Sequence, residues 1–196
     1  MQIVGVIGAG QMGAGIAQVS AQAGYRVLLA DISRERAEAG RAGIGKQLAR
    51  AVDKEKITAD ARDAALAAIE IADGPDAMGE CDLVIEAATE REAIKREIFG
   101  RVGLVLRPDA LLASNTSSIP ITRLAQASPD PARFVGVHFF NPVPVMGLIE
   151  VIRGLATADA TVAAIEAFAQ RLGKRVVHAN DAPGFIVNRV LMPMLN

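Results

Sequence analysis

The chain has 196 residues, of which 51% are hydrophobic and 4% aromatic, and its formal net charge is −1 at pH 7. This length suits one domain, or one domain and the start of another. The near-neutral charge excludes a strongly basic surface for nucleic acid or anionic membranes. A single cysteine, Cys81, excludes an internal disulfide and favours a reducing compartment, so we expect a cytoplasmic protein. The sequence predicts neither a signal peptide nor a membrane span.

The first 31 residues predict a strand–helix–strand unit. An apolar run at 2–7 ends in a glycine turn and is typical of a buried parallel strand. Residues 11–23 have helical periodicity, and Gly24 is a natural helix end. A second strand is predicted at 25–30. The whole has the length of a βαβ unit.

A helical hairpin is predicted next. Residues 33–51 form one long polar helix in this interpretation, and residues 60–69 form a second, with Thr58 as its N-cap. We expect this hairpin to be an insertion in an α/β domain.

The remaining chain alternates between strands and helices. We expect strands at 70–72, 81–87, 111–114, 134–140, 148–152 and 175–179, and helices at 90–105, 119–125, 158–172 and 185–196. Two pairs on the helix at 90–105, Glu90 with Lys95 and Glu92 with Arg96, are expected at the surface. The alternation predicts an α/β fold of the Rossmann type, with a doubly wound, mostly parallel sheet and an inserted helical hairpin.

A domain boundary is expected at the connection 181–184, which contains Pro183 and Gly184. Residues 1–183 would form a dinucleotide-binding domain, and residues 184–196 would begin a helical C-terminal domain. The last helix has an apolar face that usually packs against something more, so we infer that the chain is truncated or is completed by another chain. That face comprises Val187, Val190, Leu191, Met194 and Leu195.

A glycine fingerprint, Gly8-Ala-Gly10-Gln11-Met12-Gly13, lies between the first strand and the first helix. Gly8 permits the tight turn, Gly10 lets the backbone approach a pyrophosphate, and Gly13 allows close packing of helix on strand. The helix N-terminus offers N–H donors to phosphates. A glycine turn without a ligand is the alternative, but the position between strand and helix favours a dinucleotide.

Asp31 ends the second strand, where an acidic side chain would accept hydrogen bonds from both ribose hydroxyls. Its charge would repel a 2′-phosphate, which favours NAD(H) over NADP(H). Ser33 and Arg34 follow at once and could soften that preference.

Polar residues at 114–118 follow a predicted strand, at the sheet edge where ligands bind in such folds. They could reach a nicotinamide and a substrate oxygen. The alternative is that Ser117 or Ser118 caps the helix that begins at Ile119, and chemistry alone favours the cap.

His138 is the candidate general acid or base, because histidine titrates near neutral pH. Glu150 follows after a proline-broken loop and would fix the tautomer of the imidazole. The alternative is a core histidine and a plain strand-end carboxylate. His178 has no acidic neighbour in sequence and is interpreted as structural, and Cys81 is interpreted as inert. No metal site is predicted.

Four motifs in this order resemble the 3-hydroxyacyl-CoA dehydrogenase family, including the bacterial 3-hydroxybutyryl-CoA dehydrogenases. They are GVIGAGQMGAGIAQ at 5–18, ASNTSSIPI at 113–121, GVHFFNPVPVMGLIEVI at 136–152 and DAPGFIVNRVL at 181–191. The resemblance runs across nearly the whole chain and implies an oxidoreductase that interconverts (S)-3-hydroxyacyl-CoA and 3-ketoacyl-CoA with NAD(H).

The resemblance also implies roles for single residues. His138 would be the catalytic base, with Glu150 as its orienting acid. Ser117 would hydrogen-bond the 3-oxygen of the substrate, and Asn188 would lie near the substrate. Asn141 would help to shape the substrate site.

For the cofactor, the resemblance places Glu90 and Lys95 at the nicotinamide ribose and Asn115 near the nicotinamide. The helical hairpin would lie over the acyl-CoA, with Lys54 or Lys56 free to meet its phosphates. A surface lysine usually only solvates a helix, and that is the alternative here.

The family normally continues with a helical domain that completes the substrate site and the dimer interface, so we expect the parent protein to be a homodimer in fatty acid metabolism. The alternative is a non-catalytic NAD-binding module, or an inactive fragment that lacks the C-terminal domain. A hydroxybutyryl enzyme, a hydroxyadipyl-CoA enzyme and a fatty-acid oxidation enzyme would look alike in this sequence.

Overall fold

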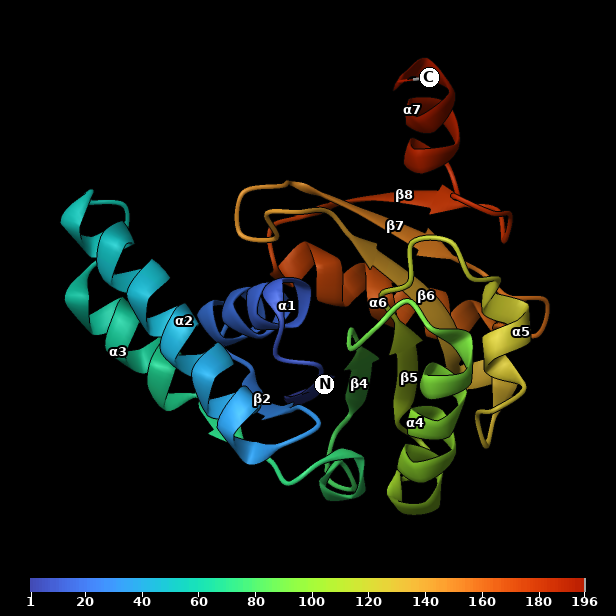
Figure 1. The fold of residues 1–196 in the computed structure, drawn as a ribbon, viewed down its shortest axis with the longest axis horizontal. Helices are drawn as coiled ribbons and strands as arrows, with labels where there is room; N and C mark the ends of the chain where they lie inside the picture. The colour runs from blue at the N-terminus through green and yellow to red at the C-terminus, as the bar shows by residue number, and fades with distance from the viewer. Residues whose placement is uncertain (196) are drawn as a thin grey trace.

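The computed structural model describes residues 1–195, whose strands form one eight-stranded sheet in the order β3-β2-β1-β4-β5-β6-β7-β8 (Figure 1). All neighbouring strands run parallel except β6 and β7, which are antiparallel. The strands are β1 (Ile3–Ile7), β2 (Arg26–Ala30), β3 (Ile69–Ile71), β4 (Leu83–Glu86), β5 (Leu111–Ser114), β6 (Phe134–Phe139), β7 (Leu148–Ile152) and β8 (Arg175–Ala179). The mostly parallel sheet is therefore confirmed.

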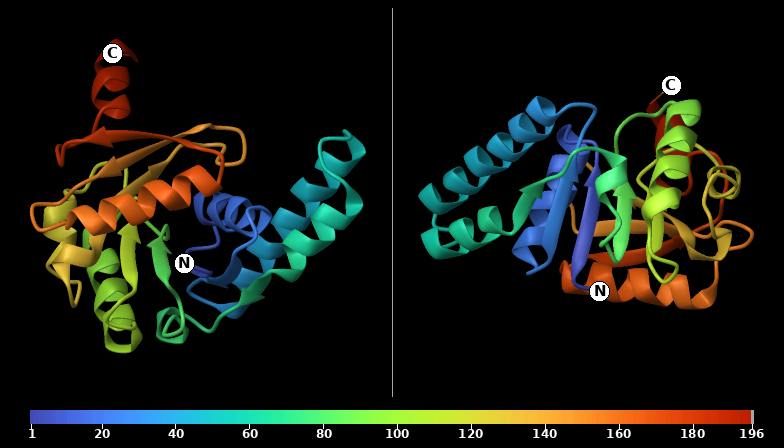
Figure 2. Two further views of the ribbon diagram at one scale, coloured as in Figure 1. Left: turned by 180° about the vertical axis from the view of Figure 1, so that it is seen from behind. Right: turned by 90° about the horizontal axis from the view of Figure 1, so that it is seen from below.

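Helices cover both faces of the sheet, as Figure 2 shows from behind and from below. One buried cluster packs α1, α2 and α6 on one face, and a second packs α4 and α5 on the other. The doubly wound arrangement is confirmed. The helices are α1 (Gln11–Gln22), α2 (Arg34–Asp53), α3 (Ala59–Ala67), α4 (Glu92–Val105), α5 (Ile121–Ala125), α6 (Asp159–Arg171) and α7 (Val187–Leu195).

Strand β2 illustrates why nearly unbroken apolar runs form this sheet. Val27 and Leu29 belong to the buried cluster beneath α1, whereas Leu28 and Ala30 belong to the cluster on the opposite face. Successive side chains of a strand point to opposite faces, so a strand covered on both sides has no polar alternation.

The hairpin of α2 and α3 extends beyond the β3 edge of the sheet (Figure 1). Its helices begin at side-chain caps, because Ser33 accepts a hydrogen bond from the Arg36 N–H and Thr58 accepts one from the Ala61 N–H. The predicted cap at Thr58 is confirmed. Arg41 of α2 donates to the carbonyls of Leu66 and Ile69 and so fastens the two helices to β3.

Asp82 joins the beginnings of β1 and β4. Its carboxylate accepts hydrogen bonds from the backbone N–H groups of Gln2 and Ile3 and from Arg107. Desolvation alone would raise the pKa of Asp82, but these hydrogen bonds outweigh it and lower the pKa from 3.8 to about 2.

Of the two surface pairs predicted here, Glu90 with Lys95 forms at 3.8 Å but with a buried lysine, and Glu92 with Arg96 does not form. Lys95 is 1% exposed and faces the end of the sheet, because its ammonium is paired with the buried carboxylate of Glu86. Glu92 pairs with Arg123 of α5, at 2.7 Å, and Arg96 donates to the Arg123 carbonyl instead of to Glu92. Packing of α4 against α5 therefore overrides the pairs expected along one helix.

The expected serine cap of α5 is also wrong. The helix begins after Pro120, and its first N–H groups, those of Ile121 and Thr122, donate to the carboxylate of Asp181. That acid lies some 60 residues later in the chain, in the connection between β8 and α7, and so was not a candidate in the local sequence. It ties the predicted boundary segment to the sheet domain.

Helix α7 stands beyond β8, away from the other helices (Figure 1). Val190, Leu191 and Met194 are exposed, in keeping with the prediction that this apolar face lacks a partner within the chain. The described residues include no helix that combines the length and the apolar character needed to cross a membrane.

Candidate active site

The carboxyl ends of the parallel strands border two adjoining cavities. The larger, of about 680 Å³, is lined by Gly8, Gly10 and Asp31 beside the glycine turn. The smaller, of about 410 Å³, is lined by residues that follow β4, β5 and β6. Ala88 and Thr89 line both, so the cavities share one wall. A long, two-part site of this kind suits a dinucleotide lying across the sheet edge.

The glycine turn has the close packing that a pyrophosphate loop needs. Gly8 has φ of +102°, and a Cβ there would lie 2.6 Å from the Ala87 carbonyl oxygen. A Cβ on Gly13 would lie 1.7 Å from the Gly8 carbonyl oxygen, whereas a Cβ on Gly10 would meet nothing within 4 Å. Gly8 and Gly13 are therefore required by close packing of the backbone, whereas Gly10 leaves open space for a ligand at the N-terminus of α1.

Asp31 lies in the wall of the larger cavity, as expected of a residue that binds ribose. One carboxylate oxygen accepts a hydrogen bond from the Ala9 N–H at 2.6 Å and the other from the Ile32 N–H at 2.7 Å, which holds the side chain beside the glycine turn. Arg34, which the sequence suggested could soften the preference for NAD(H), forms ion pairs with Glu38 and Asp73 instead. The cation nearest to Asp31 is Arg36, which the sequence did not single out and which lies 3.5 Å away.

His138 and Glu150 face each other across the antiparallel strands β6 and β7. The imidazole Nδ1 lies 2.7 Å from Glu150 Oε2, and both residues are buried. The other carboxylate oxygen accepts hydrogen bonds from the backbone N–H groups of Ile186 and Val187. The acid is thus fixed from two sides and holds Nδ1, which leaves Nε2 of the imidazole as the nitrogen free to exchange a proton.

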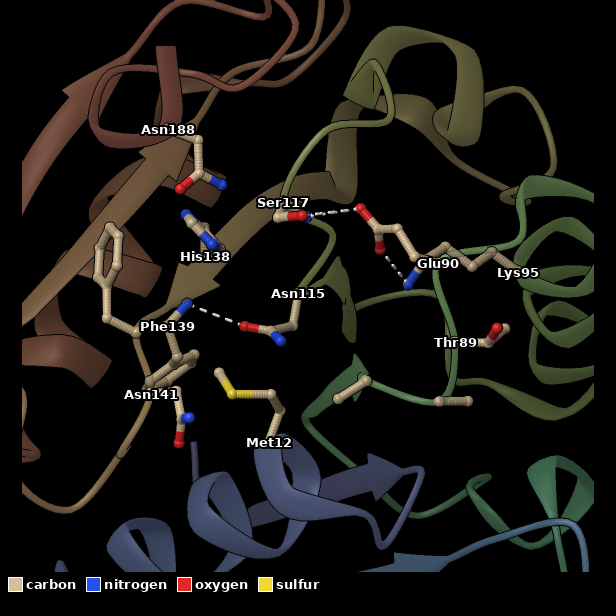
Figure 3. A pocket seen from close by; sticks show the side chains of 13 residues that line it. Met12, Thr89, Glu90, Lys95, Asn115, Ser117, His138, Phe139, Asn141 and Asn188 are labelled. Atoms are coloured by element: carbon tan, nitrogen blue, oxygen red, sulfur yellow. Dashed lines mark hydrogen bonds and ion pairs between the residues drawn. The ribbon is translucent and has the colours of Figure 1, made fainter. Parts of the chain in front are cut away.

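Aromatic rings and a neighbouring amide hold His138 in place. The imidazole packs against Phe140, at 4.6 Å between ring centroids, and against Phe185, at 5.8 Å. Asn115 accepts a hydrogen bond from the Phe139 N–H at 2.8 Å and so ties the end of β5 to the end of β6. Figure 3 shows Ser117, His138 and Asn188 gathered around the smaller cavity, which all three line.

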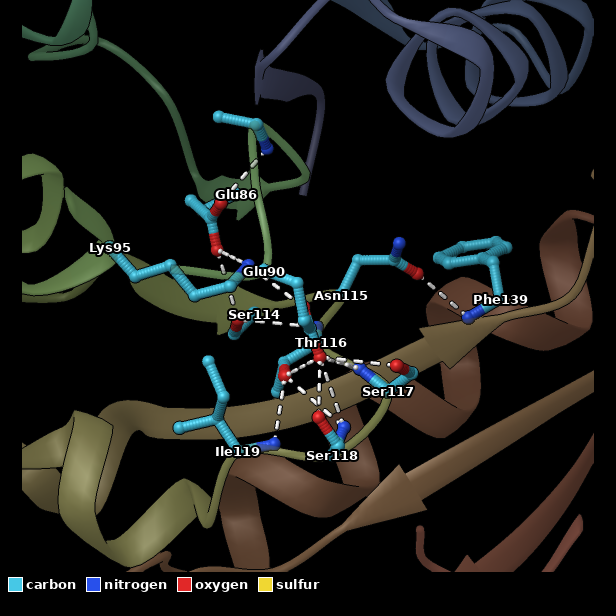
Figure 4. A network of polar contacts seen from close by, with 11 residues as sticks. Glu86, Glu90, Lys95, Ser114, Asn115, Thr116, Ser117, Ser118, Ile119 and Phe139 are labelled. Atoms are coloured by element: carbon cyan, nitrogen blue, oxygen red, sulfur yellow. Dashed lines mark hydrogen bonds and ion pairs between the residues drawn. The ribbon is translucent and has the colours of Figure 1, made fainter. Parts of the chain in front are cut away.

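Glu90 accepts hydrogen bonds from the polar turn that follows β5. Its Oε1 accepts hydrogen bonds from the hydroxyls of Thr116, Ser117 and Ser118 and from two backbone N–H groups (Figure 4). Desolvation raises the pKa of Glu90, but these hydrogen bonds and the charge of Lys95 outweigh it, so the pKa lies below its ordinary value. The carboxylate remains ionised at neutral pH and positions Ser117 beside His138.

Most predicted site residues line one of the two cavities, but Glu150 and four others do not. The smaller cavity is lined by Met12, Glu90, Lys95, Asn115, Ser117, His138, Asn141 and Asn188. Glu150 lies buried behind His138. Gln11 is exposed at the start of α1 and lines neither cavity, and Lys54 and Lys56 are exposed at the far end of the hairpin. Gly13, the fourth, is buried against Gly8.

The sequence did not single out Glu86, although it is fully buried behind the smaller cavity. The available signal was an acid at the end of an apolar strand, as it was for Asp31, which follows β2 two strands away in the sheet.

Two side chains outside the cavities also bear on the predictions. Cys81 is buried, and desolvation raises the pKa of its thiol to about 12, as expected of an inert cysteine. His178, which was interpreted as structural, has an acidic partner in the fold, since its Nε2 lies 2.8 Å from Glu166 of α6. This second His–Glu pair is about half exposed and far from both cavities.

A glycine turn that admits a dinucleotide, beside a buried His–Glu pair on the next part of the sheet edge, defines the nucleotide-binding domain of a dehydrogenase. Residues 3–182 match the family described as "3-hydroxyacyl-CoA dehydrogenase, NAD binding domain". The chain belongs to the 3-hydroxyacyl-CoA dehydrogenase family, and its cofactor is NAD(H).

Several relatives in this family are similar over nearly the whole chain. A 3-hydroxybutyryl-CoA dehydrogenase from Bradyrhizobium diazoefficiens is 54% identical over 193 residues, which are 98% of this chain and 66% of the relative. A 3-hydroxyadipyl-CoA dehydrogenase from Escherichia coli is 45% identical over 98% of this chain and 41% of its own length. The crystal structure of (S)-3-hydroxybutyryl-CoA dehydrogenase from Ralstonia eutropha superposes with a TM-score of 0.97 at 45% identity, over 100% of this chain and 69% of that one. The chain therefore spans about two thirds of the length of its 3-hydroxybutyryl-CoA dehydrogenase relatives.

Proposed function

We propose that the chain is the catalytic NAD-binding part of an enzyme that interconverts (S)-3-hydroxyacyl-CoA and 3-ketoacyl-CoA. The observation that carries the proposal is the buried pair of His138 and Glu150, 2.7 Å apart, whose histidine lines a cavity that adjoins the one beside the glycine turn. The names of the relatives support a short acyl group, as in 3-hydroxybutyryl-CoA.

Bound NAD supplies the hydride acceptor, or NADH the donor. In the oxidation, His138 takes the proton of the 3-hydroxyl group at Nε2, and Glu150 stabilises the imidazolium that forms. The Ser117 hydroxyl turns from Glu90 to donate a hydrogen bond to the same oxygen as it becomes a carbonyl, while the Ser117 N–H keeps its bond to Glu90. In the reduction, the imidazolium returns the proton. A base placed in this way contributes at least about a hundredfold to the rate.

The remaining assignments extend this scheme. We infer that Glu90, Lys95 and Asn115 meet the nicotinamide ribose and ring, because all three line the same cavity as His138. Asn141 and Asn188 would contact the substrate. Lys54 and Lys56, which are exposed at the far end of the hairpin, remain predicted contacts to the phosphates of coenzyme A.

We also propose a domain boundary, an assembly and a metabolic setting for the whole protein. We infer a boundary near 183/184 between the NAD-binding domain and a helical domain, because Val190, Leu191 and Met194 of α7 are exposed. That helical domain would form the homodimer interface. A role in fatty acid metabolism follows from an acyl-CoA substrate, and a cytoplasmic location agrees with a single buried cysteine.

The test is oxidation of NADH with acetoacetyl-CoA, followed by absorbance, for this chain and for a chain extended to the length of the relatives. Turnover in the extended chain supports the proposal, and turnover in both would show that residues 1–196 suffice. Absence of turnover in both, with NADH binding intact, would favour the alternative of a non-catalytic NAD-binding module.

A further inference from the structure

Glu86 is a fully buried carboxylate that the scheme above does not use. It ends β4, and its Oε2 accepts hydrogen bonds from Lys95 Nζ at 2.6 Å and from Ser114 Oγ at 3.0 Å (Figure 4). Its Oε1 accepts one from the Ala88 N–H at 2.9 Å. Glu86 does not line the cavity, whereas Lys95 and Ala88 do. The carboxylate can therefore act on a ligand only through these neighbours or through its charge.

The charges around Lys95 do not cancel. Its ammonium lies 2.6 Å from Glu86 and 3.8 Å from Glu90 Oε2, so two carboxylates flank one cation. The cluster of these three residues has a net formal charge of −1. Lys95 is 1% exposed and Glu86 is 0% exposed, so their charges are poorly screened by solvent. Without Glu86 the formal charge of the cluster would be zero.

The two forms of the cofactor differ in charge where this cluster acts. The nicotinamide ring is a cation in NAD⁺ and neutral in NADH. A negative cluster beside the ring stabilises the oxidised form and leaves the reduced form nearly unaffected.

We propose that Glu86 is a positioning residue that balances the charge of Lys95 and keeps this wall negative, so that the chain binds NAD⁺ more tightly relative to NADH. The inference rests on the proposed placement of the nicotinamide in the smaller cavity.

A purely structural role explains this arrangement less well. A buried ion pair is weak support for stability, because well-packed apolar residues of similar volume often stabilise a protein as much or more. A structural role also predicts that loss of Glu86 weakens the binding of NAD⁺ and NADH alike. The ratio of the two dissociation constants separates the two explanations.

The experiment measures Kd for NAD⁺ and for NADH by calorimetry, in the wild-type chain and in three variants. The net formal charge of the cluster is −2 in Lys95→Met, −1 in the double variant Glu86→Gln/Lys95→Met, and zero in Glu86→Gln. The ratio Kd(NAD⁺)/Kd(NADH) is expected to rise in that order, by roughly threefold to tenfold for each charge. The double variant should have the same ratio Kd(NAD⁺)/Kd(NADH) as the wild-type chain, even if it binds both forms more weakly.

The control is Glu70→Gln, which removes an exposed carboxylate paired with Arg26 near the opposite ends of the strands. It changes the total charge of the chain by the same amount and is expected to leave the ratio unchanged. If Glu86→Gln does not fold because Lys95 loses its buried partner, Lys95→Met, in which Ser114 and the Ala88 N–H still donate to Glu86, and the double variant still differ by one charge and carry the comparison.

Ratios that do not follow the charge of the cluster, with NAD⁺ and NADH both still bound, would overturn this inference alone. A wild-type chain that binds neither form would overturn the proposed cofactor site as well.

Discussion

Glu150→Gln tests the catalytic pair, because one amide cannot replace both functions of the carboxylate. If the amide oxygen keeps the hydrogen bonds from Ile186 and Val187, the NH₂ group faces Nδ1 of His138. Nδ1 must then accept, the proton moves to Nε2, and the imidazole cannot take a proton from the substrate. If the amide turns over, its NH₂ group meets two backbone donors and the start of α7 loses its anchor.

The first orientation costs the base its correct tautomer, and the second keeps the tautomer but sets the NH₂ group against two backbone donors and removes the negative charge that stabilises the imidazolium. Loss of the tautomer in a comparable carboxylate–imidazole pair lowers turnover by about 10⁴-fold. We expect kcat for acetoacetyl-CoA reduction to fall by about 10³-fold, which corresponds to about 4 kcal/mol. The Kd for NADH should remain within about twofold, since Glu150 does not line either cavity.

The chain offers a matched control in its second His–Glu pair. Glu166→Gln makes the same chemical change beside His178, on the surface and away from the cavities, and should leave kcat unchanged. If Glu150→Gln retained turnover within about threefold of wild type in a protein that still folds, the assignment of His138 as an oriented base would be refuted.

Four further outcomes are expected. His138→Gln should lower turnover at least about a hundredfold while NADH still binds, and near-normal turnover would exclude it as the base. Asp31→Ser should shift the ratio of Kd for NADPH to Kd for NADH by roughly tenfold toward NADPH, and an unchanged ratio would contradict the ribose contact. Gly13→Ala should lower the free energy of unfolding in urea by at least about 2 kcal/mol, because the new Cβ meets the Gly8 carbonyl, and a neutral result would show that the turn can shift. Asp82→Asn should make the free energy of unfolding, measured in urea at a series of pH values, depend less on pH below about pH 4, and an unchanged dependence would contradict this role of Asp82. Since the folded pKa of Asp82 is depressed to about 2, its stabilisation is present above pH ~4 and is lost as the pH falls through about 2.

The sequence predicted most of the fold because its signals are local. Apolar runs located the strands, and glycines placed where only a hydrogen fits identified the cofactor turn. Thr58 was predicted as a cap from its position alone, and the structure confirms it. By contrast, the serine turn was misread as a cap because the real cap, Asp181, is distant in sequence.

The antiparallel pairing of β6 and β7 was not predicted either. Periodicity shows that a strand is buried, but it does not show the direction in which the strand runs. His138 and Glu150 were therefore joined by resemblance, whereas the structure joins them by register. The burial of Lys95 was also not predicted, but for a different reason. Its partner Glu86 looked like the end of an ordinary core strand.

The cross-strand register of His138 and Glu150 has a consequence for evolution. Their alignment is set by the ladder of hydrogen bonds between β6 and β7, not by the length of the loop between the strands. That loop can gain or lose residues in descendants while the pair stays aligned. A single residue inserted within β7 would instead turn Glu150 to the opposite face of the sheet. Length differences among active relatives should therefore be confined to the loop, and an insertion inside either strand would mark a lineage that has abandoned the reaction.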